Sequence, residues 1–371
     1  MIFQFGTSRF LQAHVDLFAW EASKAGQKVP AIAIVQVSND PGRGERLHAF
    51  NNPSGFPVYI RGLKDGRIID ESTQVKSVKC GLSASRDWAA LCSAFVHHAT
   101  HIVSNSGDAG FEIPQEDHVR PLEGAPRSFC AILLSLLHLR WCAGQPGVTL
   151  MPCELVASNG RTLQRHVSAL AEAWALDAPF RQWLATDCKW VNTLVDRIVS
   201  EPLEPAGAVA EPYALWAIEE QPELRLPFTH PSVVLTPDLE PFERLKLHIL
   251  NLGHTWLAEQ WQSAGADFQV TVLALMQDDG ARKGLEELYE GEILPGFAAR
   301  GMEWAAKAYI AETLQRFANP YLHHRMADIH SAHPAKMRKR MGGFVRWVDD
   351  SGRNVPLPRL RAALGHYEGQ K

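Results

Sequence analysis

The residues best suited to proton transfer lie in one short segment, Pro241 to Trp256. With about 100° per residue of α-helix and Lys246 at zero, Glu243 falls at roughly 60°, His254 at roughly 80° and Asn251 at roughly 140°. These four polar groups share one side of the predicted helix. A lysine there could act as a general base if burial or a nearby positive charge lowered its pKa toward neutrality. Glu243 could lead protons to solvent or form an ordinary surface ion pair.

The rest of this segment indicates how the helix packs. The side opposite these polar groups is an apolar stripe that could face a core; it consists of Leu245, Ile249, Leu252 and Trp256. A solvated surface helix is the plainer interpretation of the polar side. However, that side also carries Leu247 and Leu250, which a fully solvated face usually avoids. The pattern therefore favours the wall of a cleft.

A second group of candidate residues follows the first predicted strand. Ile2–Phe5 runs into Gly6-Thr7-Ser8-Arg9-Phe10, a turn whose following helix could hold a pyrophosphate on its N-terminal amides. Of a complete glycine-rich fingerprint Gly6 alone is present, so a plain turn is the alternative. The second predicted strand leads to Asp40, at the distance where an acid bonds a ribose hydroxyl and favours NAD over NADP. The neighbouring Arg43 argues mildly the other way.

A third group follows a later strand, in the segment from Pro152 to Gly160. Asn159-Gly160 is a common turn pair and could be no more than that. Because ligands of parallel α/β sheets meet the carboxyl ends of strands, the same pair could also lie at a binding site.

These residues require a parallel sheet to position them. The first half of the chain alternates short apolar runs with helical patterns, which is typical of βα units. The predicted strands are Ile2–Phe5, Ala31–Ser38, His101–Ser104 and Val148–Pro152, and the predicted helices are Phe10–Ala25, Arg86–His98, Arg127–Cys142 and Arg161–Ala175. A small antiparallel insert is expected from Val58–Arg61, Arg67–Asp70 and Gln74–Val78.

The second half of the chain differs. After Val233-Val234-Leu235, the last clear strand, nearly everything from Pro241 to Gly342 is predicted to be helical. We therefore expect two domains, residues 1–238 and residues 239–371, with the boundary near Pro237 to Pro241. The expected fold class is α/β with a mostly parallel N-terminal sheet, followed by a mainly α-helical C-terminal domain.

Length and composition agree with two ordinary globular domains. The chain has 371 residues, 46% of them hydrophobic and 21% charged. A formal net charge of -4 gives no reason to expect nucleic acid as a partner, so a small molecule is favoured. No stretch is apolar and long enough to suggest a membrane partner. Nothing in the sequence forces association, so a monomer or a weak homo-oligomer is expected.

The cysteines and the N-terminus indicate the cellular compartment of the protein. Six cysteines without a CxxC pair suit a reducing cytoplasm. Met1 is followed at once by the strand-like Ile2–Phe5, with no charged region before it and no small-residue cleavage site soon after it, so no signal peptide is predicted. A cytoplasmic location is the expectation.

Taken in order, the motifs resemble those of the mannitol dehydrogenase family, the polyol-specific long-chain dehydrogenases. The resemblance spans nearly the whole chain. Within the family, the sequences of the motifs are most similar to those of the tagaturonate reductase (altronate oxidoreductase) branch, and the fructuronate reductase branch is the next most similar. The matching segments are Gln4–His14, Tyr59–Leu63, Pro152–Leu155, Asn159-Gly160, Thr193–Val199, Lys246 with Asn251 and His254, and Arg316–Pro320.

The resemblance implies a Rossmann-type N-terminal domain, a helical C-terminal domain, an NAD cofactor and a site without metal. It makes Lys246 the catalytic lysine, which would exchange a proton with a sugar-acid or polyol oxygen during hydride transfer. Asn159 and Asn251 match the pair that hydrogen-bonds the reacting oxygen, and His254 matches the substrate-orienting histidine. The expected cofactor contacts are Gly6, Ser8, Arg9, Phe10, Asp40, Asn105 and Asp196.

Two departures from the family pattern bear on function. Ser8 replaces the second glycine of the turn, which predicts a looser approach of the pyrophosphate. The chain also stops at Lys371, without the helical extension of longer members, which bears on the substrate. For a sugar acid, Lys336 and Arg338 are the candidate cations for the carboxylate, although a solvated basic face is the plainer interpretation.

Two other functions remain open from sequence. His97 and His101 are four residues apart, a spacing that zinc can use, but no glutamate or cysteine accompanies them at a familiar distance. A catalytically inactive dinucleotide sensor would fit the Ser8 change and the short C-terminus. Retention of Lys246, Asn251 and His254 argues against the sensor, because sensing needs no proton-transfer group. Within the family, a fructuronate reductase or a mannitol-type polyol dehydrogenase is the alternative.

Overall fold

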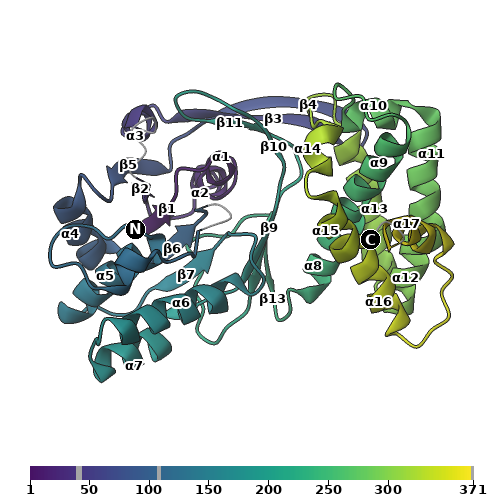
Figure 1. Cartoon of the computed structure of the whole chain (residues 1–371). Coiled ribbons are helices and arrows are strands. Elements are labelled where there is room, and N and C mark those ends of the chain that lie inside the picture. Colours follow the sequence, from purple (N-terminus) through teal and green to yellow (C-terminus); the bar gives the residue numbers. More distant parts are fainter. Residues whose placement is uncertain (39–43, 107–109, 369–371) are drawn as a thin grey trace. The chain divides into compact units, whose positions relative to one another are not determined.

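A six-stranded parallel sheet forms the centre of the N-terminal part of the chain (Figure 1). The structure is a computed structural model and describes residues 1–38, 44–106 and 110–368. In spatial order the strands are β5 (Val78–Ser83), β2 (Ile32–Gln36), β1 (Ile2–Phe5), β6 (His101–Ser104), β7 (Thr149–Pro152) and β8 (Lys189–Trp190). The pairs are parallel throughout, which confirms the predicted sheet.

The central strands are buried on both faces. Every residue of β1 and of β2 is buried, as expected for short, mostly apolar runs in a parallel sheet covered by helices. Successive side chains of a strand point to opposite faces, so Ile2 joins one hydrophobic cluster and Phe3 the other. Gln4 and Gln36 are the buried polar exceptions, and Gln4 Nε2 donates to Asp16 Oδ2 at 3.2 Å. Burial raises the pKa of Asp16 to about 8.

Helices flank this sheet (Figure 1). Three of the predicted helices are confirmed with slightly different bounds, as α4, α5 and α6. The helices of this part are α1 (Arg9–Gln12), α2 (Val15–Lys24), α3 (Gly44–Phe50), α4 (Trp88–His98), the 3-10 helix η2 (Gln115–His118), α5 (Phe129–Cys142), α6 (Asn159–Ala173) and α7 (Ala178–Thr186).

The prediction of one helix from Phe10 to Ala25 is wrong, because the chain breaks between α1 and α2. His14 has φ -128° and ψ -97°, outside the helical region. Its Nε2 lies 3.0 Å from the carbonyl oxygen of Leu215, and Arg197 Nη1 donates to the carbonyl oxygen of Ala13 at 2.7 Å. These partners come from about 200 residues away in sequence, so the local helical pattern could not reveal the break.

Two smaller sheets complete the strands. One has the order β10 (Val199–Pro202), β11 (Ala208–Ala210), β3 (Phe56–Lys64) and β4 (Arg67–Val75), and the other has the order β13 (Val233–Thr236), β12 (Leu215–Glu219) and β9 (Thr193–Asp196). The predicted three-stranded insert is wrong in detail. Its first two strands form the long hairpin of β3 and β4, while Val78 begins β5 of the parallel sheet.

The described chain divides into two compact units. The first comprises Met1–Ile60, Glu71–Ala210 and Ala214–Leu239; the second comprises Arg61–Asp70, Glu211–Tyr213 and the chain from Glu240 onward. The tip of the β3–β4 hairpin and a three-residue crossing therefore belong to the helical unit. In the part of the chain that the structure describes, no helix has both the length and the apolar character that a membrane span needs.

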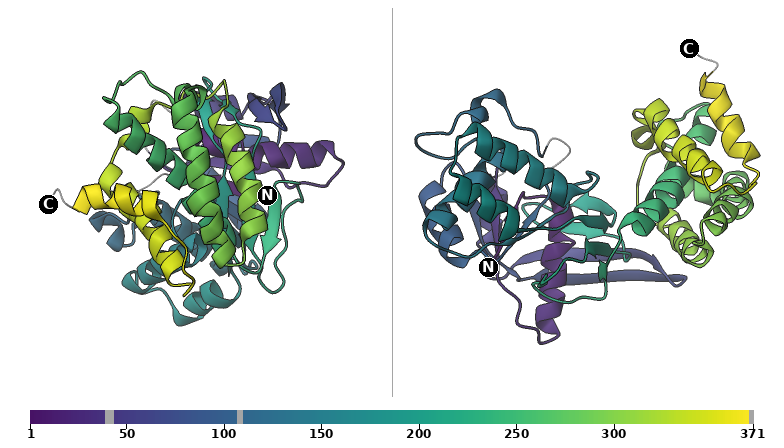
Figure 2. Two further views of the ribbon diagram at one scale, coloured as in Figure 1. Left: turned by 90° about the vertical axis from the view of Figure 1, so that its right-hand side faces the viewer. Right: turned by 90° about the horizontal axis from the view of Figure 1, so that it is seen from below.

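The second unit is helical, and the left view of Figure 2 faces its helices. Its core gathers large side chains such as Trp256, Tyr289 and Phe344. The helices are α8 (Glu240–Leu245), the π-helix η3 (Lys246–Asn251), α9 (Leu252–Ser263), α10 (Val272–Gln277), α11 (Asp279–Leu288), the π-helix η4 (Tyr289–Ile293), α12 (Leu294–Ala299), α13 (Glu303–Phe317), α14 (Met326–His330), α15 (His333–Met337), the π-helix η5 (Arg338–Gly342), α16 (Gly343–Asp349) and α17 (Pro358–Glu368).

The motif Arg316–Pro320 anchors the two outlying segments of the second unit. Arg316 pairs with Glu211 through two hydrogen bonds of 2.8 and 2.9 Å, and both side chains are almost fully buried. The guanidinium also lies 4.3 Å from the ring centroid of Tyr213. Asn319 Nδ2 donates to the carbonyl oxygen of Arg61 at 3.1 Å. The motif therefore has a structural role in holding the crossing and the hairpin tip.

Candidate active site

The turn after β1 requires glycine at position 6. Gly6 has φ of 106°, and a Cβ there would lie 2.4 Å from the carbonyl oxygen of Asn105, which follows β6. β1 lies between β2 and β6, so the chain leaves it toward one side of the sheet and later returns on the other. Such a switch point is where α/β sheets usually bind ligands. Gly6 and Asn105 approach each other closely at this switch point, where β1 and β6 end.

A cavity of about 410 Å³ opens at this switch point. The predicted contacts Gly6, Ser8 and Asn105 line it, whereas Arg9 and Phe10 do not. Phe10 instead stacks on His14, with ring centroids 4.7 Å apart. The lining comes from the turn after β1, the end of β2, α3, the segment after β6 and the start of α5; it consists of Gly6, Thr7, Ser8, Gln36, Val37, Ser38, Arg46, Asn105, Ser106, Gly110, Glu112, Arg127, Ser128 and Phe129.

The Ser8 departure leaves the turn unstrained. Ser8 has φ -66° and ψ 144°, an ordinary extended conformation, and its Oγ accepts from the backbone N–H of Leu11 at 3.2 Å. It therefore acts as the N-cap of α1. The position needs no glycine-specific backbone, unlike Gly6.

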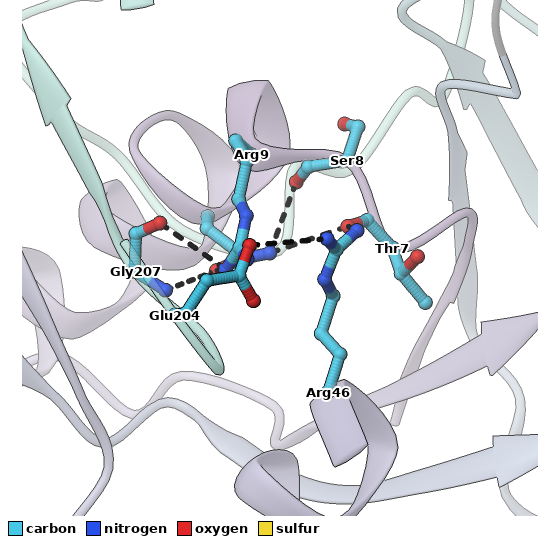
Figure 3. Close-up of polar contacts among 7 residues, drawn as sticks. Thr7, Ser8, Arg9, Arg46, Glu204 and Gly207 are labelled. Atoms are coloured by element: carbon cyan, nitrogen blue, oxygen red, sulfur yellow. Dashed lines mark hydrogen bonds and ion pairs between the residues drawn. The ribbon is translucent and has the colours of Figure 1, made fainter. Parts of the chain in front are cut away.

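Arg9 belongs to a charge cluster beside the cavity (Figure 3). Its Nη2 lies 2.7 Å from Glu204 Oε1, and its Nη1 donates to the carbonyl oxygen of Gly207 at 3.3 Å. Arg46 Nη2 lies 3.9 Å from the same carboxylate oxygen, and its Nη1 donates to the carbonyl oxygen of Thr7 at 3.2 Å. Two arginines thus share one carboxylate next to the first turn.

A buried carboxylate supports the segment after β6. Glu154 Oε2 accepts from Ser104 Oγ at 2.9 Å, and Oε1 accepts from the backbone N–H and Oγ of Ser106 at 3.1 and 3.0 Å. Burial raises the pKa of Glu154, while these hydrogen bonds lower it. Since Ser106 lines the cavity, Glu154 positions part of its wall. The sequence pattern contained Glu154 within Pro152–Leu155 but gave it no role.

Both polar atoms of the Asn159 side chain form hydrogen bonds within the first compact unit. Its Nδ2 donates to the carbonyl oxygens of Pro152, Glu154 and Thr193 at 2.9, 3.1 and 2.9 Å. Its Oδ1 accepts from the backbone N–H groups of Gly160 and Thr193, both at 2.9 Å. An amide has two hydrogens, and in this structure both are bonded to backbone carbonyls, so that Asn159 joins the ends of β7 and β9. A hydrogen bond from Asn159 to a reacting oxygen stays a prediction.

Two acids were also predicted to contact the cofactor, Asp196 and Asp40. Asp196 is the last residue of β9 and is buried at 3% exposure, but it does not line the cavity. Asp40, the expected ribose ligand, lies outside the described residues.

Lys246 begins a π-helix rather than continuing an α-helix. The α-helical angles predicted for Lys246, Asn251 and His254 are therefore wrong beyond Lys246, because η3 spans Lys246–Asn251. Bonding from i to i+5 widens the turn, so residues five apart, such as Lys246 and Asn251, come about one turn apart. Such wide turns are frequent at functional sites. The carbonyl oxygen of Ile249 accepts from Tyr289 Oη at 3.0 Å.

Arg340 braces the end of this π-helix. Its Nη1 donates to the carbonyl oxygen of Asn251 at 3.1 Å and to Thr255 Oγ1 at 3.0 Å. Arg340 lies in a second π-helix, η5. Its backbone carbonyl oxygen is hydrogen-bonded to His248 Nδ1 at 3.0 Å. Burial lowers the pKa of Arg340. The sequence analysis singled out the nearby Lys336 and Arg338 but not Arg340.

His254 is buried next to a second histidine. Its ring centroid lies 4.3 Å from that of Phe317 and 5.3 Å from that of His324. Partial burial, together with the charge of Lys336, lowers the pKa of His324, against the opposing effect of Asp328. The structure thus places His254 beside His324 within the helical unit, and the charge of Lys336 acts on His324.

The two candidate cations for a carboxylate differ in environment. Lys336 is partly buried, and its Nζ donates to the carbonyl oxygen of Ile329 at 2.7 Å. Partial burial, followed by the charge of Arg340, lowers the pKa of Lys336. Arg338 is exposed and forms no ion pair with the residues that the structure describes. We keep Lys336 as the candidate and interpret Arg338 as a solvated cation.

The histidine pair considered for zinc has ordinary partners. His101 Nε2 is bonded to the carbonyl oxygen of Arg225 at 2.9 Å, and its Nδ1 to Thr100 Oγ1 at 3.0 Å. Within residues 1–38, 44–106 and 110–368, no three histidine, cysteine or acidic side chains are grouped so as to hold a metal ion.

Comparisons with known proteins agree with this geometry. The family model described as "Mannitol dehydrogenase Rossmann domain" matches residues 1–227, and that described as "Mannitol dehydrogenase C-terminal domain" matches residues 238–367. Altronate oxidoreductase of Halalkalibacterium halodurans is 31% identical over 99% of this chain and 75% of its own length. Altronate oxidoreductase of Bacillus subtilis is 29% identical over 88% of this chain and 71% of its own length.

Two solved structures share the fold. A substrate-free D-sorbitol dehydrogenase superposes with a TM-score of 0.76 at 19% identity, covering 95% of this chain and 77% of that one. Mannitol 2-dehydrogenase of Pseudomonas fluorescens, in a ternary complex with NAD and D-mannitol, superposes with a TM-score of 0.73 at 18% identity, covering 98% of this chain and 83% of that one.

The structural role of Asn159 predicts a loss of stability on substitution. Asn159→Ala leaves buried carbonyl and N–H groups without partners, so we expect the free energy of unfolding to fall by about 3 kcal/mol or more. Chemical denaturation measures this, with Asn51→Ala as control, because the exposed Asn51 can exchange its hydrogen bonds for water. A variant with normal stability and greatly reduced turnover would instead return Asn159 to the reacting oxygen.

Proposed function

The chain belongs to the mannitol dehydrogenase family, and we propose that it is the member that interconverts altronate and tagaturonate with NAD. The partly buried Lys336 carries the proposal, because a hexuronate has a carboxylate that a neutral polyol lacks. The two altronate oxidoreductases, similar over most of the chain, support the same substrate class.

In this proposal residues 1–238 hold the cofactor and residues 239–371 carry the groups for proton transfer and substrate binding. The cavity at the switch point fits a dinucleotide, because Gly6 lets the turn after β1 pack closely on the end of β6, and Thr7, Ser8, Ser106 and Ser128 line the cavity with polar groups. When bound, the nicotinamide takes up or returns the hydride of the reacting carbon.

Lys246 supplies the proton transfer in this proposal. Oxidation of a secondary alcohol removes the hydroxyl proton, which a neutral Lys246 amine accepts; in the reducing direction the ammonium returns it. The side-chain amide of Asn251 donates a hydrogen bond to the same oxygen, a contact commonly worth a few kcal/mol when it strengthens in the transition state. His254 orients the substrate. Arg340, bonded to the Asn251 carbonyl, keeps the widened turn in place.

Lys336 meets the substrate carboxylate in this proposal. A lysine ammonium that is partly withdrawn from water binds a carboxylate more strongly than a fully exposed one, since less screening separates the charges. Its fixed contact to the Ile329 carbonyl leaves further ammonium hydrogens to donate. The charge of Lys336 also acts on His324, whose ring lies 5.3 Å from that of His254.

Removal of the Lys246 amine tests the mechanism. Lys246→Ala should lower kcat by about 10²–10⁴-fold because no group replaces the proton carrier, while NADH affinity stays near that of the parent. Steady-state rates and NADH titration measure the two effects, and the exposed Lys339→Ala is the control. Recovery of turnover on adding a small primary amine would strengthen the assignment. Normal turnover in Lys246→Ala would remove Lys246 from the mechanism.

Removal of the Lys336 charge tests the substrate class. Lys336→Met should raise the KM for tagaturonate by about tenfold or more, because a partly buried partner of the carboxylate is lost. The KM for NADH should stay the same, and Lys339→Met, which removes an exposed neighbouring charge, should change neither constant appreciably. An unchanged KM for tagaturonate in Lys336→Met would exclude Lys336 from carboxylate binding.

A further inference from the structure

One carboxylate balances two arginines beside the cofactor cavity. Glu204 lies in the connection between β10 and β11, and its side chain is 74% exposed. The same oxygen, Oε1, lies 2.7 Å from Arg9 Nη2 and 3.9 Å from Arg46 Nη2. Figure 3 shows the carboxylate between the two guanidinium groups. Within the part of the chain that the structure describes, these contacts bring two positive charges and one negative charge together.

The two arginines are held differently. Arg9 has further acceptors in the carbonyl oxygen of Gly207 at 3.3 Å and Gln12 Oε1 at 3.4 Å. It also does not line the cavity. Arg46 does line it, and its Nη1 donates to the carbonyl oxygen of Thr7 in the turn after β1. Of the two charges, that of Arg46 is the one presented to a bound ligand.

Arg46 lies where sheets of this type bind the ribose that is attached to adenine. It shares the cavity wall with Gln36 and Ser38, from the end of β2 and the residues after it. In doubly wound sheets an acid at the end of the second strand bonds the ribose hydroxyls, whereas an arginine nearby accommodates a 2′-phosphate. Taken alone, Arg46 would therefore favour the phosphorylated dinucleotide.

We propose that Glu204 sets the choice of cofactor by occupying the charge of Arg46, so that the site disfavours a 2′-phosphate and retains NAD. This inference rests on the proposed function, because it assumes that the cavity binds a nicotinamide dinucleotide. The Glu204 carboxylate, 3.9 Å from Arg46 Nη2, repels a second anion at the Arg46 guanidinium. A neutral ribose hydroxyl does not meet this penalty.

The size of the effect follows from Coulomb's law. A unit charge at about 4 Å changes an affinity by about fivefold even at the dielectric constant of water, and by more where the wall of the cavity excludes solvent. Because Glu204 is mostly exposed, the lower end is the appropriate expectation. Screening by salt should reduce the effect.

The test uses the full-length protein and measures the dissociation constants of NADH and NADPH by calorimetric titration at low and high salt. Glu204→Gln keeps the shape of the side chain and removes its charge. The matched control is Glu45→Gln, since Glu45 is exposed, precedes Arg46 in α3 and lines the same surface hollow as Glu204. The double variant Glu204→Gln, Arg46→Met tests whether Arg46 transmits the effect. Thermal melting shows that each variant folds.

The expected result is tighter NADH than NADPH binding by the parent, and in Glu204→Gln a gain of about fivefold or more for NADPH with little change for NADH. Glu45→Gln should show no such gain, and the double variant should lose it. Equal gains in the Glu204 and Glu45 variants, a gain that survives loss of Arg46, or no gain at all would overturn the inference and leave the proposed function standing. Failure of the parent to bind either dinucleotide would overturn both.

Discussion

The contact between Gly6 and the carbonyl of Asn105 is the constraint on which the cofactor site depends. At this point two neighbouring parallel strands end, and the chain leaves them in opposite directions. The turn after β1 passes so close to the end of β6 that a side chain at position 6 would collide with backbone. The cavity, the N-cap at Ser8 and the charge cluster of Arg9, Arg46 and Glu204 all follow from the course of this turn.

Buried polar side chains hold the loops around the site, and several residues that suggested chemistry serve this purpose. Asn159 joins the ends of β7 and β9, Glu154 fixes the segment after β6, and Arg316 with Glu211 fastens the crossing to the helical unit. Each satisfies groups that would be costly to bury alone. The reacting groups proposed here, Lys246, Asn251 and His254, instead lie in or next to a π-helix, whose carbonyls are braced by Tyr289 and Arg340.

The parts that local sequence determines could be predicted. β1 and β6 agree with the structure residue for residue, because short apolar runs flanked by turns depend mainly on their own burial. The break at His14 and the π-helix at Lys246 could not be predicted, since their causes are partners distant in sequence, such as Leu215 and Arg340. The same holds for the pairing of His254 with His324. Asn159 was found by its motif, but its role became clear only when its five hydrogen bonds were known.

Rates of NADH and NADPH oxidation with tagaturonate, fructuronate, fructose and fructose 6-phosphate test most directly whether the protein reduces a hexuronate with NADH. We expect NADH with tagaturonate to give the highest kcat/KM and the neutral ketose to give little turnover. Turnover confined to neutral or phosphorylated ketoses would contradict the assigned substrate while leaving the proton-transfer groups in place. Binding of NADH without turnover of any of the four would contradict the account and favour a dinucleotide sensor.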